Sequence, residues 1–198
     1  MVASPHERLT PDQYLQQEAQ SPIKHEYFDG EICAMAGASD AHVTIAGNLF
    51  ALLRSHVRGT GCRVYIADMK ARIETRNRFY YPDLMVTCDP RDQATTTYKR
   101  FPKLIVEVLS DSTEAFDRGD KFADYQTLSS LHEYVIINTY HQKVECFRRR
   151  SNGLWELQYY TTATGPFHLA SLNFSGSLSA LYEDVVLEAP PRRPGPGS

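Results

Sequence analysis

Two acidic residues lie in strand-like segments where burial of a carboxylate would be unfavourable. Asp83 follows Pro82 in FYYPDLMV, and Glu107 lies within the apolar run KLIVEVLS. A carboxylate inside such a run is costly to bury unless a cation or a hydrogen-bond donor compensates it. Lys121 follows on a helix-like segment. Two acids and one lysine, once brought together, are a minimal set for metal-assisted phosphodiester hydrolysis.

Asp83 and Glu107 each have a structural interpretation as well as a catalytic one. Proline cannot donate a hydrogen bond to a sheet ladder, so Pro82 marks a strand edge or break that can aim Asp83 out of the sheet. A strand-end acid paired with an arginine would have the same pattern. Glu107 shares one strand face with Ile105 and Leu109. An acid among so many aliphatic residues belongs either to a site or to a buried salt bridge.

Lys121 belongs to a stripe on a predicted helix. Asp117, Lys121 and Tyr125 are spaced four residues apart, so they share one helical face. Asp–Lys pairs at this spacing are common on helix surfaces, which is the ordinary interpretation. The short link over residues 110–114 returns the helix over the strand that carries Glu107, and this favours contact between Lys121 and Glu107.

Three other residues are weaker candidates. Glu26 precedes a predicted hairpin and is explained better as a solvated charge at a helix end. Asp68 interrupts the strand-like stretch VYIADMKARI and could face a site. His42 lies at the start of a helix, where a lone histidine is more often a capping or core residue than a ligand.

The order of the elements predicts an α/β or α+β domain, in which helices flank a mixed central sheet. The pattern Thr10-Pro11-Asp12-Gln13 predicts a capped helix to about Glu18, and Asp29-Gly30 predicts a hairpin turn. The run over 103–109 is nearly all apolar, as in a strand covered on both faces. The remaining predicted elements are a helix after Ser39 or Asp40 with Val43, Ala46, Leu49, Phe50 and Leu53 inward, paired strands over 63–74 and 79–88, a polar loop over 89–100, a helix from 111, strands over 134–138, 144–149 and 154–160, and a short helix over 178–186.

Length and composition indicate one globular domain. The chain has 198 residues, is 42% hydrophobic, and has a formal net charge of −3, so no global positive field attracts it to nucleic acid. The four cysteines form no CxxC pair, which argues against a zinc site and fits free thiols in a reducing cytoplasm. No apolar stretch is long enough to span a membrane. We expect one domain over 1–188 and a disordered tail over 189–198.

Taken together, the motifs resemble a known family. YPDLMV, LIVEVLSDST and the D-x-x-x-K-x-x-x-Y pattern of Asp117, Lys121 and Tyr125 are similar to the Uma-type restriction endonucleases, members of the PD-(D/E)XK nuclease superfamily. EYFDGEICAMAGAS resembles the N-terminal signature of that family. The similarity runs over residues 9–186. It implies a restriction-endonuclease-like core and metal-dependent hydrolysis of DNA.

The resemblance also implies roles for individual residues. Asp83 and Glu107 would be metal ligands, Lys121 the charged catalytic partner, and Glu26 an additional catalytic acid. The third position of the (D/E)XK triplet is Leu109 rather than lysine, and Lys121 on the next helix takes over that role. Mg²⁺ is the expected cofactor, with Mn²⁺ as a substitute. The candidate supporting residues are Asp117, Tyr125 and Asp68.

Binding of DNA would require a local basic patch, because the chain as a whole is slightly acidic. Two classes of function remain open: a Mg²⁺-dependent DNA endonuclease, and a catalytically silent member that binds nucleic acid or a protein. Hydrolysis of another phosphodiester would use the same site. A homodimer is expected, because cleavage of two strands favours paired sites. The candidate DNA contacts are Lys70, Arg72, Lys99, Arg100, Lys103 and Arg118.

Overall fold

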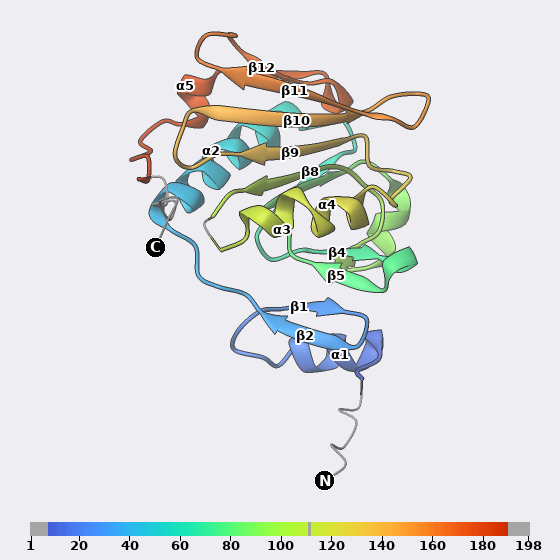
Figure 1. Ribbon diagram of the computed structural model, residues 1–198. Coiled ribbons are helices and arrows are strands. Elements are labelled where there is room, and N and C mark those ends of the chain that lie inside the picture. The colour runs from blue at the N-terminus through green and yellow to red at the C-terminus, as the bar shows by residue number, and fades with distance from the viewer. Residues whose placement is uncertain (1–7, 111, 190–198) are drawn as a thin grey trace.

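The computed structural model describes residues 8–110 and 112–189. In this part of the chain the strands form two main sheets and a small two-stranded one, with helices packed against them (Figure 1). The mixed α/β architecture predicted from the sequence is confirmed.

The N-terminal segment contributes a helix and a hairpin to the smaller main sheet. Helix α1 (Pro11–Glu18) begins after Thr10, which forms a complete capping box with Gln13. The hairpin turns at Asp29 and Gly30, which both have the positive φ that a type I′ turn requires. The strand order is β2-β1-β5-β4-β7. These strands are β1 (His25–Phe28), β2 (Glu31–Ala34), β4 (Lys70–Ile73), β5 (Arg78–Tyr80) and β7 (Tyr98–Lys99).

The larger sheet carries both acidic candidates. Its order is β11-β10-β9-β8-β6-β3, with β8 and β9 parallel and the other neighbours antiparallel. Glu107 lies in central strand β8, and Asp83 directly precedes the neighbouring strand β6. The strands are β3 (Arg63–Ile66), β6 (Leu84–Thr87), β8 (Pro102–Val108), β9 (Glu133–Ile137), β10 (Lys143–Arg149) and β11 (Trp155–Thr161).

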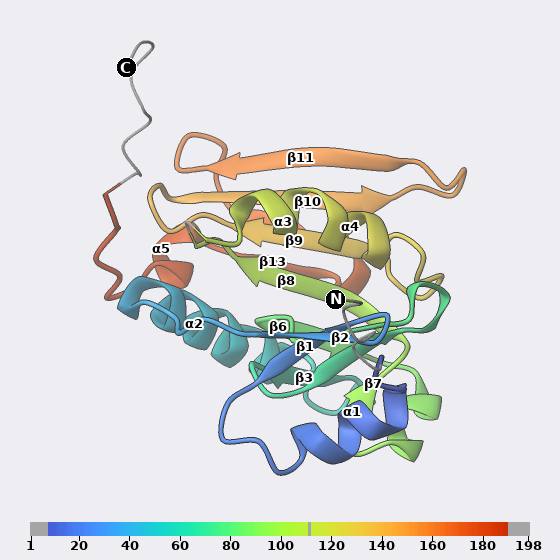
Figure 2. The same cartoon turned by 60° about the horizontal axis from the view of Figure 1, so that its bottom comes forward.

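Helices cover both faces of the larger sheet. Helix α2 (Asp40–His56) lies on one face, whereas α3 (Glu114–Arg118) and α4 (Asp120–Tyr125) lie on the other (Figures 1 and 2). Residues 104, 106 and 108 of β8 pack in the core on the α2 side, and residues 105 and 109 pack with α4. The alternation predicted for this strand is confirmed, and it places Glu107 on the face toward α4.

The prediction of two long paired strands over 63–74 and 79–88 is wrong. Each stretch is divided, so that β3 pairs with β6 in the larger sheet and β4 pairs with β5 in the smaller one. The first division occurs at Ala67, which has a φ of 58°. Alanine rarely adopts this left-handed conformation, so the sequence carries no turn signal there.

Smaller differences occur elsewhere. The helix predicted from residue 111 is interrupted at Gly119 into α3 and α4. The polar loop contains β7 and the 3₁₀ turn η2 (Pro90–Ala94), and Val43 is 58% exposed rather than buried. The C-terminal part adds β12 (Phe167–Leu169) and β13 (Phe174–Gly176), which were not predicted, and α5 (Leu178–Leu181) is shorter than expected.

The prediction of four free cysteines is also wrong. Cys62 and Cys88 form a disulfide that links the ends of the paired strands β3 and β6, whereas Cys33 and Cys146 are free. The pairing of Cys62 with Cys88 follows from the antiparallel register of β3 and β6, which the prediction did not contain.

The C-terminal tail predicted over 189–198 lies outside the described residues except for Ala189. The single domain over 1–188 stays a prediction. None of the helices within 8–110 and 112–189 is sufficiently long and apolar to cross a membrane.

Candidate active site

Lys121 and Glu107 form the centre of a buried charged cluster. The Lys121 ammonium lies 3.0 Å from Glu107 Oε1, and 3.4 Å from both Glu26 Oε1 and Asp117 Oδ1. Only 5% of Lys121 and 3% of Glu107 is exposed. One buried lysine therefore faces three carboxylates from three different elements, β1, β8 and α3.

The pKa values of this pair reflect burial and crowding of like charges. Burial lowers the pKa of Lys121, but Glu107, Glu26 and Asp117 outweigh it and raise that pKa well above its usual value. Burial raises the pKa of Glu107 well above its usual value, although Lys121 acts in the opposite direction. The lysine is thus held as a cation, while the glutamate is short of positive charge.

Asp83 is fixed beside Glu107 by two hydrogen bonds, each from a backbone amide to a carboxylate. Val108 N donates to Asp83 Oδ2 at 2.7 Å, and Asp83 N donates to Glu107 Oε2 at 3.4 Å. Pro82 breaks the strand between β5 and β6, as the sequence predicted for this position. The Asp83 side chain is 22% exposed, so it forms the solvent-facing side of the cluster.

Glu26 belongs to the cluster rather than to the solvent. Its Oε1 accepts a hydrogen bond from Tyr81 N at 3.1 Å, next to its contact with Lys121. The pairing of β1 with β5 brings Glu26 to this position. The interpretation as a solvated helix-end charge is therefore wrong, whereas the catalytic role that the resemblance implies for Glu26 stays a prediction.

Two of the candidate supporting residues also reach the cluster. Asp117 contacts Lys121 even though Gly119 interrupts the helix between α3 and α4. The Tyr125 hydroxyl donates to Glu107 Oε1 at 3.1 Å. The stripe of residues 117, 121 and 125 predicted from the sequence thus faces Glu107.

His42 is a member of the site that sequence reasoning left aside. Its Nε2 lies 2.8 Å from Asp83 Oδ1, and its Nδ1 is buried without a hydrogen-bond partner among the described residues. Burial lowers the pKa of His42, but the hydrogen bond and negative charge of Asp83, together with the charges of Asp117 and Glu188, outweigh it and raise that pKa above the usual value. The sequence did place His42 in the first turn of a predicted helix. It could not show that this turn lies beside Asp83, because the strands that pack against the helix were not known.

The other candidates lie apart from the cluster. Asp68 has a side chain 79% exposed and pairs with Lys24. Lys70 and Lys99 are buried, and Lys99 donates to two backbone carbonyl oxygens. The remaining DNA-contact candidates are Arg100, paired with Glu74; Arg118, paired with Glu114 and Glu145; Arg72, bound to neutral oxygens; and the half-buried Lys103.

The donor set suits a hard divalent cation. In this cluster four carboxylates face two basic side chains, so the acids outnumber the bases. Its members are Glu26, Asp83, Glu107, Asp117, His42 and Lys121. Within the described residues no group of three or more His, Cys, Asp or Glu side chains is arranged to hold a metal ion. The two acids predicted to bind Mg²⁺, Asp83 and Glu107, are both members of this cluster, and two carboxylates with water and phosphate oxygens are an ordinary ligand set for that ion.

Comparison with known proteins identifies relatives that match most of the chain. Residues 11–179 match the model of the Uma2 family, described as "Putative restriction endonuclease". An uncharacterized protein of Synechocystis sp. is 37% identical over 184 residues, which is 93% of this chain and 96% of that protein. A second one from Synechocystis sp. is 34% identical and covers 79% of this chain and 90% of its own length.

A solved structure has a similar fold. It is the crystal structure of "a putative nuclease belonging to DUF820" from Anabaena variabilis, with a TM-score of 0.73, 16% identity, and coverage of 90% of this chain and 99% of that one. The likeness confirms the nuclease-like fold predicted from the sequence.

Proposed function

The chain belongs to the Uma2 family of restriction-endonuclease-like proteins, and from this premise we propose that it is a Mg²⁺-dependent DNA endonuclease. The proposal rests above all on one observation: a buried lysine, Lys121, contacts Glu107 while Asp83 is hydrogen-bonded beside it. This is the set of residue types that a PD-(D/E)XK site uses, with the lysine supplied by α4 instead of the strand.

In the proposed site each side chain has a distinct task. Asp83 and Glu107 would hold Mg²⁺, which supplies charge neutralisation at the phosphodiester and a lower pKa for a bound water. Lys121 carries a fixed positive charge toward the reacting phosphate and orients the attacking water. Tyr125 holds Glu107 in place through its hydroxyl. Glu26 keeps Lys121 in its cationic form.

A plasmid assay tests the proposal directly. Supercoiled DNA is incubated with protein in EDTA, Mg²⁺ or Mn²⁺, and nicked and linear products are measured. We expect cleavage that needs the metal and falls about 10²–10³-fold in Glu107→Gln and in Lys121→Met, the loss typical for removal of one electrostatic catalytic group.

The matched control is Asp68→Asn, because Asp68 is an acid of the same half of the chain that lies exposed outside the cluster. Its cleavage rate should equal that of the wild type. Undiminished cleavage by Glu107→Gln would reject the site, and equal loss in Asp68→Asn would show a general effect of charge.

One observation favours the second candidate, a catalytically silent binding protein. Glu107 is paired with Lys121, and Asp83 with His42 and Val108 N, so the acids have partners within the protein. A silent scaffold would gain no stability from Mg²⁺ or Mn²⁺, whereas an ion bound at the site raises the melting temperature. Absence of any shift, together with absence of cleavage, would favour this candidate.

Two further proposals concern assembly and location. We propose a homodimer, which light scattering at working concentration tests; a monomer at all concentrations would reject it.

We also propose a cytoplasmic location, in which Cys62 and Cys88 would be kept reduced. Alkylation of thiols at the moment of cell lysis tests this, because Cys62 and Cys88 that escape alkylation as a disulfide would contradict it.

A further inference from the structure

His42 belongs to the candidate active site, yet the proposed function gives it no task. Its Nε2 lies 2.8 Å from Asp83 Oδ1, and its side chain is 14% exposed. An ionised carboxylate can only accept a hydrogen bond, so the imidazole donates in this contact. Since Val108 N donates to Asp83 Oδ2 at 2.7 Å, both oxygens of Asp83 are held. Two donors on two oxygens leave this carboxylate little freedom to rotate.

The other nitrogen of His42 does not orient the ring. Nδ1 is buried and makes no hydrogen bond to any residue that the structure describes. The position of the imidazole therefore depends on its contact with Asp83 and on the backbone that carries it. That backbone is the first turn of α2, which begins at Asp40.

The first turn of α2 is tied to the C-terminal segment by Glu188. Ser39, the N-cap of α2, accepts a hydrogen bond from His42 N at 3.2 Å, and its hydroxyl donates to Glu188 Oε1. Thr139 Oγ1 donates to Glu188 Oε2 at 3.0 Å, and Glu188 N donates to Thr139 O at 3.1 Å. Thr139 is fully buried just after β9. Glu188 thus fastens the start of α2 to the larger sheet.

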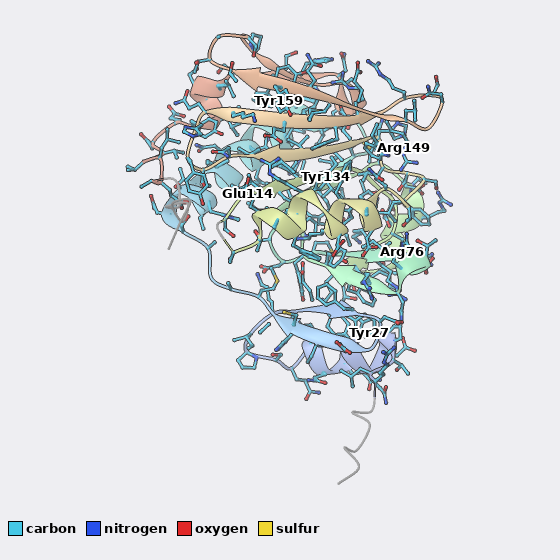
Figure 3. All side chains as sticks on the ribbon, in the orientation of Figure 1. Tyr27, Arg76, Glu114, Tyr134, Arg149 and Tyr159 are labelled. Carbon is cyan, nitrogen blue, oxygen red and sulfur yellow. A yellow bond between two sulfur atoms is a disulfide. The ribbon has the colours of Figure 1, made fainter. Side chains whose placement is uncertain are left out.

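This link lies at the end of the sheet that carries the site. The C-terminal segment runs beside the start of α2 (Figures 1 and 2). The parallel strands β8 and β9 end here, and the antiparallel strand β6 begins here, directly after Asp83. Figure 3 shows another acid, Glu114, at the start of α3 on the opposite face. Glu114 pairs with Arg118 at 2.8 Å, so the link to α2 is made by Glu188.

We infer that His42 is a positioning residue that orients Asp83 for the divalent metal, and that Glu188 acts through His42 by holding the first turn of α2 in place. Since the metal is that of the proposed nuclease, the inference rests on the proposed function. Groups that hydrogen-bond to a metal ligand typically contribute about 10–100-fold to metal affinity.

The test measures metal affinity in the absence of DNA. Isothermal titration calorimetry with Mn²⁺ compares wild type, His42→Leu and His42→Gln. We expect His42→Leu, which has no donor, to bind Mn²⁺ about 10–100-fold more weakly. His42→Gln should recover most of the affinity, because a glutamine amide can donate to Asp83 in place of Nε2. Equal affinity in wild type and His42→Leu would overturn the inference.

His56→Leu is the matched control. His56 lies in the last turn of the same helix and contacts Leu172 O instead of the site. Its Mn²⁺ affinity should equal that of the wild type. The melting temperature of every variant in EDTA separates loss of affinity from loss of fold, and His42→Gln keeps the test informative if His42→Leu folds poorly.

A double-mutant cycle tests the part of Glu188. Glu188→Ala should weaken Mn²⁺ binding by less than His42→Leu does, whereas Glu183→Ala, an exposed acid of the same segment, should not weaken it. Ser39→Ala breaks the same link without a change of charge and should weaken binding as Glu188→Ala does.

The cycle combines Glu188→Ala with His42→Leu. Glu188→Ala should have no further effect on Mn²⁺ affinity in the His42→Leu background, because Glu188 acts through His42. An unchanged affinity in Glu188→Ala alone, or two losses that add, would overturn the role of Glu188.

The plasmid assay separates this inference from the proposed activity. If the wild type binds Mn²⁺ without cleaving DNA and His42→Leu loses affinity, the positioning role stands while the nuclease fails. If wild type and His42→Leu bind metal and cleave equally well, the nuclease stands and the inference fails. Recovery of metal affinity without recovery of cleavage in His42→Gln would give His42 a direct part in the reaction and overturn its assignment as a positioning residue.

Discussion

Glu107 and Glu133 are buried acids on neighbouring strands of the same sheet, yet their surroundings are opposite. Glu133 is fully buried and accepts hydrogen bonds from Arg148 Nε at 2.8 Å, Ala170 N at 3.0 Å and Ser171 N at 2.8 Å. Burial raises its pKa, but the hydrogen bonds from Ser171 and Arg148 outweigh it and leave the pKa below its usual value.

Glu107 also has donors, but its charged donor is shared with other acids, and it has more acidic neighbours. It shares Lys121 with Glu26 and Asp117, and its pKa is raised. The comparison teaches that burial alone does not identify a functional acid. An acid whose donors satisfy it serves the fold, whereas an acid short of positive charge can accept a cation or a substrate.

The largest effect should come from removal of Glu133, the acid whose hydrogen bonds are satisfied within the fold. Replacement of Glu133 by alanine leaves Arg148 without its carboxylate and two backbone amides without their acceptor. We expect a loss of about 3–5 kcal/mol in the free energy of unfolding, as for other broken buried pairs. Urea denaturation measures it. A loss below about 1 kcal/mol would show that the contacts of Glu133 contribute little to the stability of the fold.

The pH dependence of stability should separate the two acids by sign. Glu133 has a lowered pKa in the folded protein, so its stabilisation is present above the unfolded pKa near 4.5 and is lost as pH falls. Glu107 has a raised pKa in the folded protein, so the stability that it contributes is lost as pH rises from about 4.5 toward the folded pKa.

Urea denaturation of wild type, Glu133→Gln and Glu107→Gln in EDTA measures these slopes, up to about 1.4 kcal/mol per pH unit for one group. With rising pH the Glu107→Gln protein should gain stability relative to the wild type. The Glu133→Gln protein should lose stability relative to the wild type. Parallel curves for all three proteins would contradict the comparison.

Divalent metal should act on only one of the two acids. At ten times the dissociation constant, Mg²⁺ should raise the free energy of unfolding of the wild type by about 1.4 kcal/mol. The same gain is expected in Glu133→Gln and none in Glu107→Gln. Thermal unfolding with and without metal measures this, and a gain retained in Glu107→Gln would place the ion elsewhere.

The smallest effect should come from the tyrosine hydroxyl that donates to Glu107. Tyr125→Phe removes a hydrogen bond to a carboxylate while it keeps the ring among Tyr80 and Tyr134. We expect cleavage to fall by about tenfold or less and stability to change by about 1 kcal/mol. A loss as large as that of Lys121→Met would make the hydroxyl a direct participant in the reaction.

Local patterns in the sequence predicted the strand that carries Glu107 and the helix that carries Lys121. Alternation in residues 103–109 and the spacing of 117, 121 and 125 depend on neighbours within a few positions, and the structure brings them together. Gly119 was a visible sign that the helix could be interrupted.

What the sequence did not contain is pairing over long distances. The transfer of the chain between the two sheets depends on the conformation of Ala67, and the disulfide depends on the register of β3 with β6. The partner of His42 lies 41 residues further along the chain. Such contacts are set by the tertiary fold, which overrides the local preference of each residue.

The cluster draws its members from β1, α2, the residue before β6, β8, α3 and α4, so it closes only when residues 26–121 have reached their places. Contacts so distant in sequence form late, because loop closure must precede them. A chain emerging from the ribosome, or one partly unfolded, would therefore carry all the acids but no assembled centre. In this protein, enzymatic competence would be a property of the finished fold alone, and a folding intermediate would be harmless to the nucleic acid around it.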